Sequence, residues 1–533
     1  MIREKGIAGG WYLSITICFM FFIYAPLEMF FLNQIDFFFD LYILLPVLGI
    51  LFALSLCLCI LFFLMLKKLG DGPYFIGLCG MFIAFICSYI QGNFLVEFLP
   101  VLDGNWVEWD KYPLERMKCI GVWIGVTLVV VIMYKAVNRI LFEKIVLIIS
   151  VCMGLMLLVT VSIIGISKYD FKKKEIYNTT TKDLFAMSTN ENFIILLLDA
   201  VDAQTFTQVV NEDPDYRDIF DDFTAFNNTV GATPSTRESI PYILTGKWYE
   251  KQSQFEEYEK QAYRDSPLFQ MLENKGYLMG VYEEELLLDE EEKRFDNVVT
   301  CKRSVTSYLT FARWQVQMVG FRYAPFDLKR FCFINPMAFN TLKVSPNAEE
   351  QFVADNINFY EKIQTEEIKL VDESCFKFIH IEGGHVPFQY NAKVERINNG
   401  TYEDNLRACL TITNAYLNKL RDENVYDNSV IIIMADHGYD NCIRSNPILY
   451  IKGVGEKHKF QVSDAPISYE DLQGAYSKLL QGKDSKNCFE YQEGDVRKRR
   501  FLLDTDGGPI YEYIQSGHAA DETTINKTGV VYE

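Results

Sequence analysis

Long apolar stretches separated by short polar breaks dominate the first third of the chain. A helix needs about 20 apolar residues to cross ~30 Å of hydrocarbon. Three of the stretches reach that length, and the two shorter ones contain no charged residue. Buried helices of a soluble protein would not follow one another with charged breaks between them. The pattern therefore predicts five transmembrane helices within residues 1–166, at roughly Trp11–Phe31, Leu41–Leu66, Tyr74–Ile90, Cys119–Tyr134 and Ile145–Ile166.

Lysine and arginine residues near the ends of these stretches predict the orientation, because they favour the cytoplasmic side. The basic residues of three segments fall on one side: Arg3 and Lys5, Lys67 and Lys68, and Lys135, Arg139 and Lys144. An odd number of spans then places residues 167–533 outside the cytoplasm. Lys168 and Lys172–Lys174 oppose this assignment, but long translocated domains weaken the charge rule. We therefore expect a multi-pass protein of the cell membrane with an extracytoplasmic domain.

The pattern changes after the fifth stretch. Residues 167–191 are polar and are expected to form a juxtamembrane linker. From residue 192 onward, short apolar runs alternate with longer helical patterns, which predicts an α/β domain with a mostly parallel sheet flanked by helices. We assign residues 192–533 to this one domain. The expected strands are Asn192–Leu198, Tyr277–Tyr282, Phe376–Ile381, Val430–Met434 and Pro447–Lys452, the expected helices include Ala348–Thr365 and Asn405–Asp422, and Arg500–Leu503 and Pro509–Ile514 are expected edge strands.

Charge and cysteine content narrow the possible functions. The net charge of −19 argues against a nucleic-acid partner. No two cysteines have C-x-x-C spacing, so a zinc knuckle or a dithiol redox motif is not expected. The six cysteines after the spans permit disulfides without establishing them; they are Cys301, Cys332, Cys375, Cys409, Cys442 and Cys488.

Two of the predicted strands end in residues that can bind a metal. The strand at Val430–Met434 leads into Asp436-His437-Gly438, and the strand at Asn192–Leu198 leads into Asp199. Open α/β sheets bind ligands at the carboxyl ends of their strands, and carboxylate with imidazole suits a divalent metal. A single Asp-His pair at a strand end is equally compatible with a solvated histidine. The second strand end, with His380 and His385 between the two in sequence, favours a metal-dependent active site.

A hydroxyl-rich segment, Gly231–Gly246, lies between the first two expected strands. Ser235 or Thr236 could cap a helix there, with Glu238 in its first turn. A hydroxyl at a helix N-terminus also faces the backbone N–H groups that bind anions. A metal close by would lower the pKa of such a hydroxyl and make it a nucleophile.

Three motifs of the chain resemble those of the alkaline phosphatase/sulfatase superfamily. Thr236-Arg-Glu-Ser239-Ile-Pro241 is similar to its nucleophile segment, and His380-Ile-Glu-Gly-Gly-His385-Val-Pro387 and Asp436-His437-Gly438 match its later motifs. The membrane-anchored branch, which includes lipoteichoic acid synthases and lipid A phosphoethanolamine transferases, has the most similar layout. The resemblance implies that one divalent metal, Zn²⁺ or Mn²⁺, is bound by Asp199, Thr236, Asp436 and His437. It implies that His380 and His385 contact the phosphate or the leaving group.

The chain departs from this family pattern at several positions. Asp199 stands where the named branch usually has glutamate, and Ala200 stands where sulfatases usually have a second aspartate. The segment Gly231–Gly246 contains no cysteine, so a formylglycine-dependent sulfatase is not expected. At the place of a late histidine of the family, we expect Tyr469. The other two histidines, His458 and His518, are expected on the surface.

The resemblance implies a membrane-bound phosphotransferase. Thr236 would attack a membrane phospholipid donor, and the phospho-threonine would pass a phosphoglycerol or phosphoethanolamine group to a cell-envelope glycan or lipid acceptor. The same residues also suit a hydrolase, either a phosphodiesterase or a sulfatase. The third alternative is a membrane scaffold without activity. The sequence leaves the headgroup, the acceptor and the metal open.

Overall fold

The chain forms two compact units. The computed structural model describes residues 8–34, 37–96, 107, 109–169, 176–284, 286, 294–334, 342–344, 350–439, 445–504 and 508–533. The first unit comprises Met1–Lys174 and Lys302–Val344, and we call it the helical unit. The second comprises Glu175–Cys301 and Ser345–Glu533, and we call it the sheet unit.

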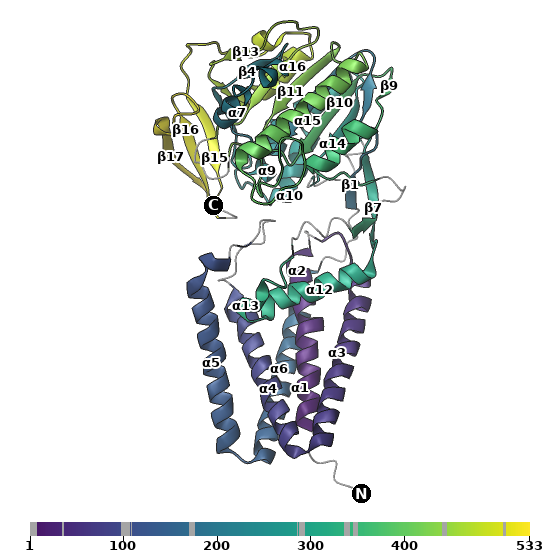
Figure 1. Cartoon of the computed structure of the whole chain (residues 1–533), viewed down its shortest axis with the longest axis vertical. Coiled ribbons are helices and arrows are strands. Elements are labelled where there is room, and N and C mark those ends of the chain that lie inside the picture. The colour runs from purple at the N-terminus through teal and green to yellow at the C-terminus, as the bar shows by residue number, and fades with distance from the viewer. Residues whose placement is uncertain are drawn as a thin grey trace. The chain divides into compact units, whose positions relative to one another are not determined.

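The helical unit contains five helical segments that are long and apolar enough to cross a membrane (Figure 1). The first, Ala8–Leu32, consists of α1 (Ala8–Phe19), a π-helical turn (Met20–Tyr24) and α2 (Ala25–Leu32). The others are α3 (Leu41–Leu69), α4 (Asp71–Phe94), α5 (Pro113–Ala136) and α6 (Arg139–Lys168). The five predicted apolar helices are thus confirmed, each longer than its apolar stretch. Arg3, Lys5 and Lys172–Lys174, which enter the charge argument, lie outside the described residues.

Two further helices of the helical unit come from the second half of the chain. They are α12 (Tyr308–Tyr323) and α13 (Phe326–Lys329), which the sequence pattern assigns to the 192–533 domain. Arg322 of α12 forms an ion pair of 2.7 Å with Glu28 of α2. The hydroxyl of Tyr24 also donates a hydrogen bond of 2.9 Å to Glu28. These partners compensate a carboxylate that would otherwise be costly in an apolar helix.

The sheet unit is built on a mixed, mostly parallel sheet of seven strands in the order β13-β4-β12-β11-β3-β10-β6. The central strands β11 (Ser429–Met434), β3 (Asn192–Leu198), β10 (Cys375–Ile381) and β6 (Leu278–Tyr282) are parallel. The strands β12 (Leu449–Lys452) and β4 (Thr224–Phe226) pair antiparallel, β12 is antiparallel to β11, and β13 (Gln461–Ser463) is parallel to β4. Every residue of β3 is buried. The continuous apolar run of this strand follows from burial on both faces.

Helices cover both faces of this sheet, as Figure 1 shows for α15 and α14 on the near face. One apolar core packs α7 (Ala203–Val210), α14 (Asn356–Thr365) and α15 (Tyr402–Asp422) against the sheet. The other core packs α9 (Thr236–Thr245), α11 (Pro267–Asn274) and α16 (Leu472–Leu479) against the opposite face. The predicted α/β class with a mostly parallel, helix-flanked sheet is confirmed. The remaining elements of the unit include β1 (Ile176–Thr179), β2 (Ala186–Ser188), β5 (Thr229–Val230), β9 (Lys369–Val371), β14 (Ile467–Ser468), α8 (Pro214–Asp218) and α10 (Phe255–Arg264). The strand β7 (Val298–Val305) begins in this unit, and its residues from Lys302 onward belong to the helical unit.

The C-terminal strands differ from their prediction. β15 (Arg499–Leu503), β16 (Ile510–Gln515) and β17 (Ile525–Tyr532) form a separate antiparallel sheet and are not edge strands of the main sheet. Their own pairing satisfies the backbone, and the N–H group of Leu502 donates to the carbonyl of Ala232 at 2.8 Å. This contact joins the tail sheet to the segment that precedes α9.

The cysteines after the spans do not show a disulfide framework in the described part of the chain. Four of them have free thiols: Cys332, Cys375, Cys409 and Cys488. Cys442 and the side chain of Cys301 lie outside what the structure describes.

Candidate functional site

The carboxyl ends of β3 and β11 bring Asp199, Asp436 and His437 together. The two strands are neighbours in parallel register, so the residues that follow them meet at the same edge of the sheet. Each of the three residues is buried and offers one ligand atom within 4.8 Å of the others. The Nε2 atom of His437 lies 3.3 Å from Oδ2 of Asp436 and 3.7 Å from Oδ1 of Asp199.

Two carboxylate oxygens and one imidazole nitrogen of this group are available to bind a cation. Oδ1 of Asp199 and Oδ2 of Asp436 are buried and have no hydrogen-bond partner among the described residues. The other oxygen of Asp436 accepts a bond of 3.0 Å from the N–H group of Ala200. Nδ1 of His437 lies 2.7 Å from the carbonyl of Gly438, which places the ring proton on Nδ1 and leaves the Nε2 lone pair facing the carboxylates. Buried carboxylate oxygens without partners are costly unless a cation compensates them, so the group fits a divalent metal.

The backbone around Asp199 is held by close contacts. Gly383 has a φ of +59°, and a Cβ atom at this position would lie only 2.4 Å from the backbone nitrogen of Asp199. The N–H group of Gly384 donates to the carbonyl of Asp199 at 2.8 Å. The hydroxyl of Tyr402 donates to the carbonyl of Ala200 at 2.8 Å. The loop that joins His380 to His385 therefore requires glycine at residue 383 in order to pack on the end of β3.

Helix α9 delivers Thr236 to this group. Thr236 is the first residue of α9, and its Oγ1 atom lies 3.3 Å from Nε2 of His437. The hydroxyl of Ser239, one turn later, donates to the carbonyl of Asp436 at 2.6 Å and fixes the helix on the strand end. The hydroxyl of Ser235 is hydrogen-bonded to Glu238 instead. Of the two neighbouring hydroxyls, the structure thus places that of Thr236 against the Asp-His group.

His380 lies between two carboxylates. Its Nε2 atom is 3.6 Å from Oδ2 of Asp199, and its Nδ1 atom forms a short hydrogen bond with Glu283. Burial lowers the pKa of His380, but Glu283 and Asp199 outweigh burial and hold that pKa well above its ordinary value. Burial raises the pKa of Asp199, but the imidazoles of His380, His385 and His437 more than offset this and keep it below its ordinary value. In the metal-free protein His380 is therefore a cation beside an anionic Asp199.

Glu283 is not among the site residues that the sequence predicts. This residue directly follows β6, which was predicted as Tyr277–Tyr282, so it is a third carboxylate at a strand end. The same signal that selects Asp199 could have found it, because β6 lies beside β10 in the sheet. His380 receives from it a second negative partner that the motif alone does not reveal.

His385 is half-buried on the loop that follows β10. Its Nδ1 atom lies 2.5 Å from the carbonyl of Val386, and its own carbonyl accepts a bond of 3.2 Å from Asn405. The N–H group of the preceding residue, Gly384, donates to the carbonyl of Asp199 at 2.8 Å, which holds His385 near the acidic group. The structure thus brings all six sequence-predicted site residues to one edge of the sheet: Asp199, Thr236, His380, His385, Asp436 and His437.

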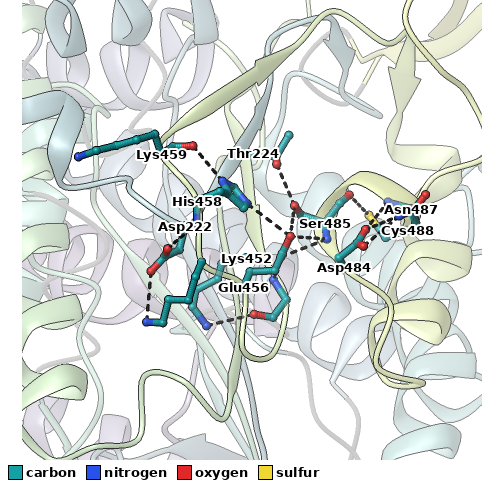
Figure 2. Close-up of polar contacts among 12 residues, drawn as sticks. Asp222, Thr224, Lys452, Glu456, His458, Lys459, Asp484, Ser485, Asn487 and Cys488 are labelled. Carbon is teal, nitrogen blue, oxygen red and sulfur yellow. Dashed lines mark hydrogen bonds and ion pairs between the residues drawn. The ribbon is translucent and has the colours of Figure 1, made fainter.

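The remaining candidates have other surroundings. Tyr469 is buried, and its hydroxyl donates to the carbonyl of Ala435, beside the site but directed at the backbone. Figure 2 shows His458 in a polar cluster with Glu456 and Ser485. Lys452 of this cluster pairs in register with Ile431, near the start of β11 and so toward the edge of the sheet opposite to Asp436. His518 is exposed and lies 3.8 Å from Asp464.

A family model and several solved structures resemble parts of this chain. Residues 191–446 match the family model described as Sulfatase. Solved structures that resemble the chain include Ps i-CgsB in complex with k-i-k-neocarrahexaose (15% identity, TM-score 0.42, covering 62% of this chain and 82% of that one). They also include a protein in the alkaline phosphatase superfamily from Vibrio parahaemolyticus (14% identity, TM-score 0.35, covering 68% of this chain and 87% of that one). A third is the phosphonate monoester hydrolase SpPMH from Silicibacter pomeroyi (12% identity, TM-score 0.34, covering 63% of this chain and 88% of that one).

No curated protein sequence matches this chain significantly. The match of the family model spans the strand ends that carry Asp199 and Asp436, the helix that carries Thr236 and the loop with both histidines. The buried Asp-Asp-His group lies inside the matched region. Residues 191–446 are therefore similar to the sulfatase family, in a chain that also carries five candidate membrane spans among its described residues.

Proposed function

We propose that this protein is a membrane-bound phosphotransferase with its sheet unit outside the cytoplasm. Thr236 would take a phospho-headgroup from a membrane phospholipid and pass it to a cell-envelope glycan or lipid. The observation that supports this most strongly is the position of the Thr236 hydroxyl. It lies at the first turn of α9, 3.3 Å from His437 and beside two carboxylates that each have a buried, unpartnered oxygen.

One divalent metal, Zn²⁺ or Mn²⁺, fits the donor set. Asp199, Asp436 and His437 would hold it together with Thr236, since three oxygens and one nitrogen suit either ion. When bound, the metal supplies positive charge that lowers the pKa of the Thr236 hydroxyl and offsets charge on the phosphoryl oxygens.

In the first half of the reaction, Oγ1 of Thr236 forms a bond to the lipid phosphorus while the bond from phosphorus to the diacylglycerol oxygen breaks. Thr236 loses its proton to water, and His385, which is half-buried and near Asp199, gives a proton to the leaving oxygen. His380, whose Nδ1 atom is hydrogen-bonded to Glu283, would donate from its other ring nitrogen to a phosphoryl oxygen. The products are Thr236 esterified to the phospho-headgroup, as a phosphodiester, and free diacylglycerol.

In the second half, an acceptor hydroxyl attacks the same phosphorus. Its oxygen–phosphorus bond forms as the bond to Thr236 breaks, its proton passes to His385, and Thr236 regains a proton from water. The five apolar helices support this assignment. They would anchor the chain in the same bilayer that contains the phospholipid donor. The absence of cysteine from Gly231–Gly246 does not support a formylglycine-dependent route.

Hydrolysis is the second candidate, because the matched family model is described as Sulfatase. Water would then replace the acceptor in the second half of the reaction, with the same residues. Phospholipid vesicles with a labelled headgroup and an envelope fraction as acceptor separate the two. Label bound to a glycan or to a lipid other than the donor supports the transferase, and label released only as a soluble phosphomonoester supports the hydrolase.

A further inference from the structure

The loop that carries His385 is held by side chains. Residues 382–389 follow β10 directly and belong to no helix or strand, and we call them the His385 loop. Their backbone N–H and carbonyl groups therefore need partners other than those of regular secondary structure. One such partner is the end of β3, where the N–H group of Gly384 donates to the carbonyl of Asp199 at 2.8 Å. Two buried asparagines supply others.

Asn356 holds the His385 loop at Gly383, two residues before the histidine. It is the first residue of α14, and its side chain is fully buried. Its Oδ1 atom accepts from the N–H group of Gly383 at 2.9 Å, and its Nδ2 atom donates to the carbonyl of the same residue at 3.0 Å. One carboxamide thus supplies the two hydrogen bonds that a neighbouring strand would otherwise give to Gly383.

Asn405 holds the same loop at His385 itself. This residue lies in the first turn of α15, and its side chain is also fully buried. Its Nδ2 atom donates to the carbonyl of His385 at 3.2 Å. Its Oδ1 atom accepts from the N–H groups of Gln389 and Tyr390, each at 3.1 Å. The side chain therefore joins the backbone of His385 to the far end of the loop.

The first turn of α15 also holds the segment that follows β3. Tyr402 lies three residues before Asn405, which places both side chains on one face of the helix. The hydroxyl of Tyr402 donates to the carbonyl of Ala200 at 2.8 Å and accepts from the N–H group of Asp202 at 2.8 Å. One helical turn thus contacts both the His385 loop and the chain directly after the acidic strand end.

The imidazole of His385 follows the backbone of this loop. Its Nδ1 atom lies 2.5 Å from the carbonyl of Val386, which is the next residue of the same loop. A shift of the loop would therefore carry the ring with it. A misplacement of about 1 Å can lower a rate about a hundredfold, and a proton donor must lie within hydrogen-bond reach of the atom that it protonates.

We infer that Asn356 and Asn405 are positioning residues that hold His385 at the leaving oxygen. This inference rests on the proposed function, in which His385 protonates that oxygen. The two carboxamides act through the loop backbone, so their loss should slow the proton transfer and leave the attack by Thr236 largely unchanged. Residues that served only folding would, when replaced, slow the reaction of every substrate alike.

Aspartate is the sharpest replacement, because it has the shape of asparagine without the amide donor. Asn356→Asp and Asn405→Asp each place an oxygen against a loop carbonyl and leave that carbonyl without a donor. Asn418→Asp, at an exposed position of α15, is the matched control. Asn405→Ser introduces no buried charge and replaces Asn405→Asp if that variant does not fold. Circular dichroism and bound metal are measured for every preparation.

The test compares two soluble phosphodiesters that differ in their need for a proton. Methyl 4-nitrophenyl phosphate releases 4-nitrophenolate, which leaves as the anion, whereas the phenolate of methyl phenyl phosphate takes a proton as it leaves. With either ester, Oγ1 of Thr236 forms the bond to phosphorus while the bond from phosphorus to the aryl oxygen breaks. Release of the phenol by the full chain in detergent is followed through the first turnover.

We expect Asn356→Asp and Asn405→Asp to act on the phenyl ester at least about tenfold more slowly than wild type, because general acid catalysis contributes that much or more. Their rates on the 4-nitrophenyl ester should stay within about twofold of wild type. His385→Gln should show the same pattern, and Asn418→Asp should match wild type. Equal losses on both esters, or no loss on either, would overturn the positioning role.

A double variant tests whether Asn405 acts through His385. In the His385→Gln background, Asn405→Asp should cause no further loss on the phenyl ester, because the group that it positions is already absent. Losses that multiply in the double variant would show that the two residues act independently, and would contradict the inference.

The comparison of esters does not depend on a lipid donor, so it separates this inference from the proposed function. If wild type shows the expected pattern but forms no adduct on Thr236 from phospholipid vesicles, the transferase proposal fails and the positioning role stands. If that adduct forms and the asparagine variants lose rate equally on both esters, the positioning role fails alone. A wild type that acts on neither ester nor on the vesicles would contradict both.

Discussion

The imidazole of His380 is hydrogen-bonded through Nδ1 to Glu283, a residue that follows a different strand of the same sheet. The other ring nitrogen lies 3.6 Å from Asp199, so the ring connects two carboxylates. Glu283 fixes the orientation of the ring and helps to keep it protonated. A phosphoryl group at Asp199 would therefore meet an imidazole whose orientation Glu283 has already fixed.

Replacing Glu283 by Gln should lower kcat by about tenfold to hundredfold, the usual effect of losing a partner that orients an imidazole. The metal content should stay the same, because Glu283 is not one of the four proposed ligands. Turnover and bound metal are measured together on the same preparation. The neighbouring change Glu284→Gln is the control and should leave both unaltered. Loss of metal in Glu283→Gln would show that Glu283 belongs to the metal group.

Replacing Asp436 by Ala should remove both the bound metal and the activity. Asp436 supplies a buried oxygen without a partner and is next to His437 in the group. The hydrogen bond from Ser239 goes to the backbone of Asp436, so α9 should keep its position. Elemental analysis of the purified full chain and circular dichroism measure the two effects. Full metal occupancy in Asp436→Ala would exclude this residue as a ligand.

The stability of the protein should depend on pH through Glu382. Burial raises the pKa of this carboxyl from 4.5 to about 7, with a hydrogen bond from Tyr390 acting in the opposite direction. The folded protein therefore binds a proton that the unfolded chain releases near pH 4.5. Stability should fall as the pH rises from about 4.5 to 7, by a few kcal/mol in total, on the order of 1.4 kcal/mol per pKa unit.

Glu382→Gln should remove this part of the pH dependence. The variant should have a higher apparent Tm than wild type above pH 7 and a similar Tm near pH 4.5, as measured by thermal melts of the full chain across this range. Glu395→Gln, at an exposed position of the same region, should follow the wild-type curve. A wild-type Tm that rises between pH 5 and 7 more than that of Glu382→Gln would contradict this assignment.

The orientation of the chain is a separate prediction. We expect residues 167–533 outside the cytoplasm, from five apolar helices and the basic residues between them. Protease added to intact cells, or to spheroplasts where an outer membrane is present, should cleave the sheet unit. Cleavage only in inverted vesicles would reverse the topology.

The site residues that the sequence could predict are those that directly follow apolar strands. The apolar runs before Asp199 and Asp436 identify buried strands, and their carboxyl ends must meet when the strands are parallel neighbours. The pairing of Glu283 with His380 depends on the order of strands in the sheet, with β6 beside β10. A run of apolar residues does not contain that order, so Glu283 was missed.

Two other predictions from the sequence differ from the structure for a similar reason. Residues 302–344 were assigned to the 192–533 domain, but α12 packs in the helical unit, where Arg322 pairs with Glu28. The tail strands alternate like edge strands, but they pair with one another in a separate sheet. The partner of α12 lies hundreds of residues away in the sequence, and the partners of the tail strands lie in the tail itself. The local pattern of apolar and polar residues does not show which partner an element will have.

The most direct test of the account is the mass of the peptide that contains Thr236 after the full chain is incubated with phospholipid vesicles and no acceptor. The account predicts a phospho-headgroup adduct on Thr236 in wild type and in Ser235→Ala, and none in Thr236→Ala. The Thr236 hydroxyl is the one placed 3.3 Å from His437, whereas that of Ser235 is bonded to Glu238. An adduct on Ser235 that persists in Thr236→Ala, or turnover by wild type without any adduct on this peptide, would contradict the account.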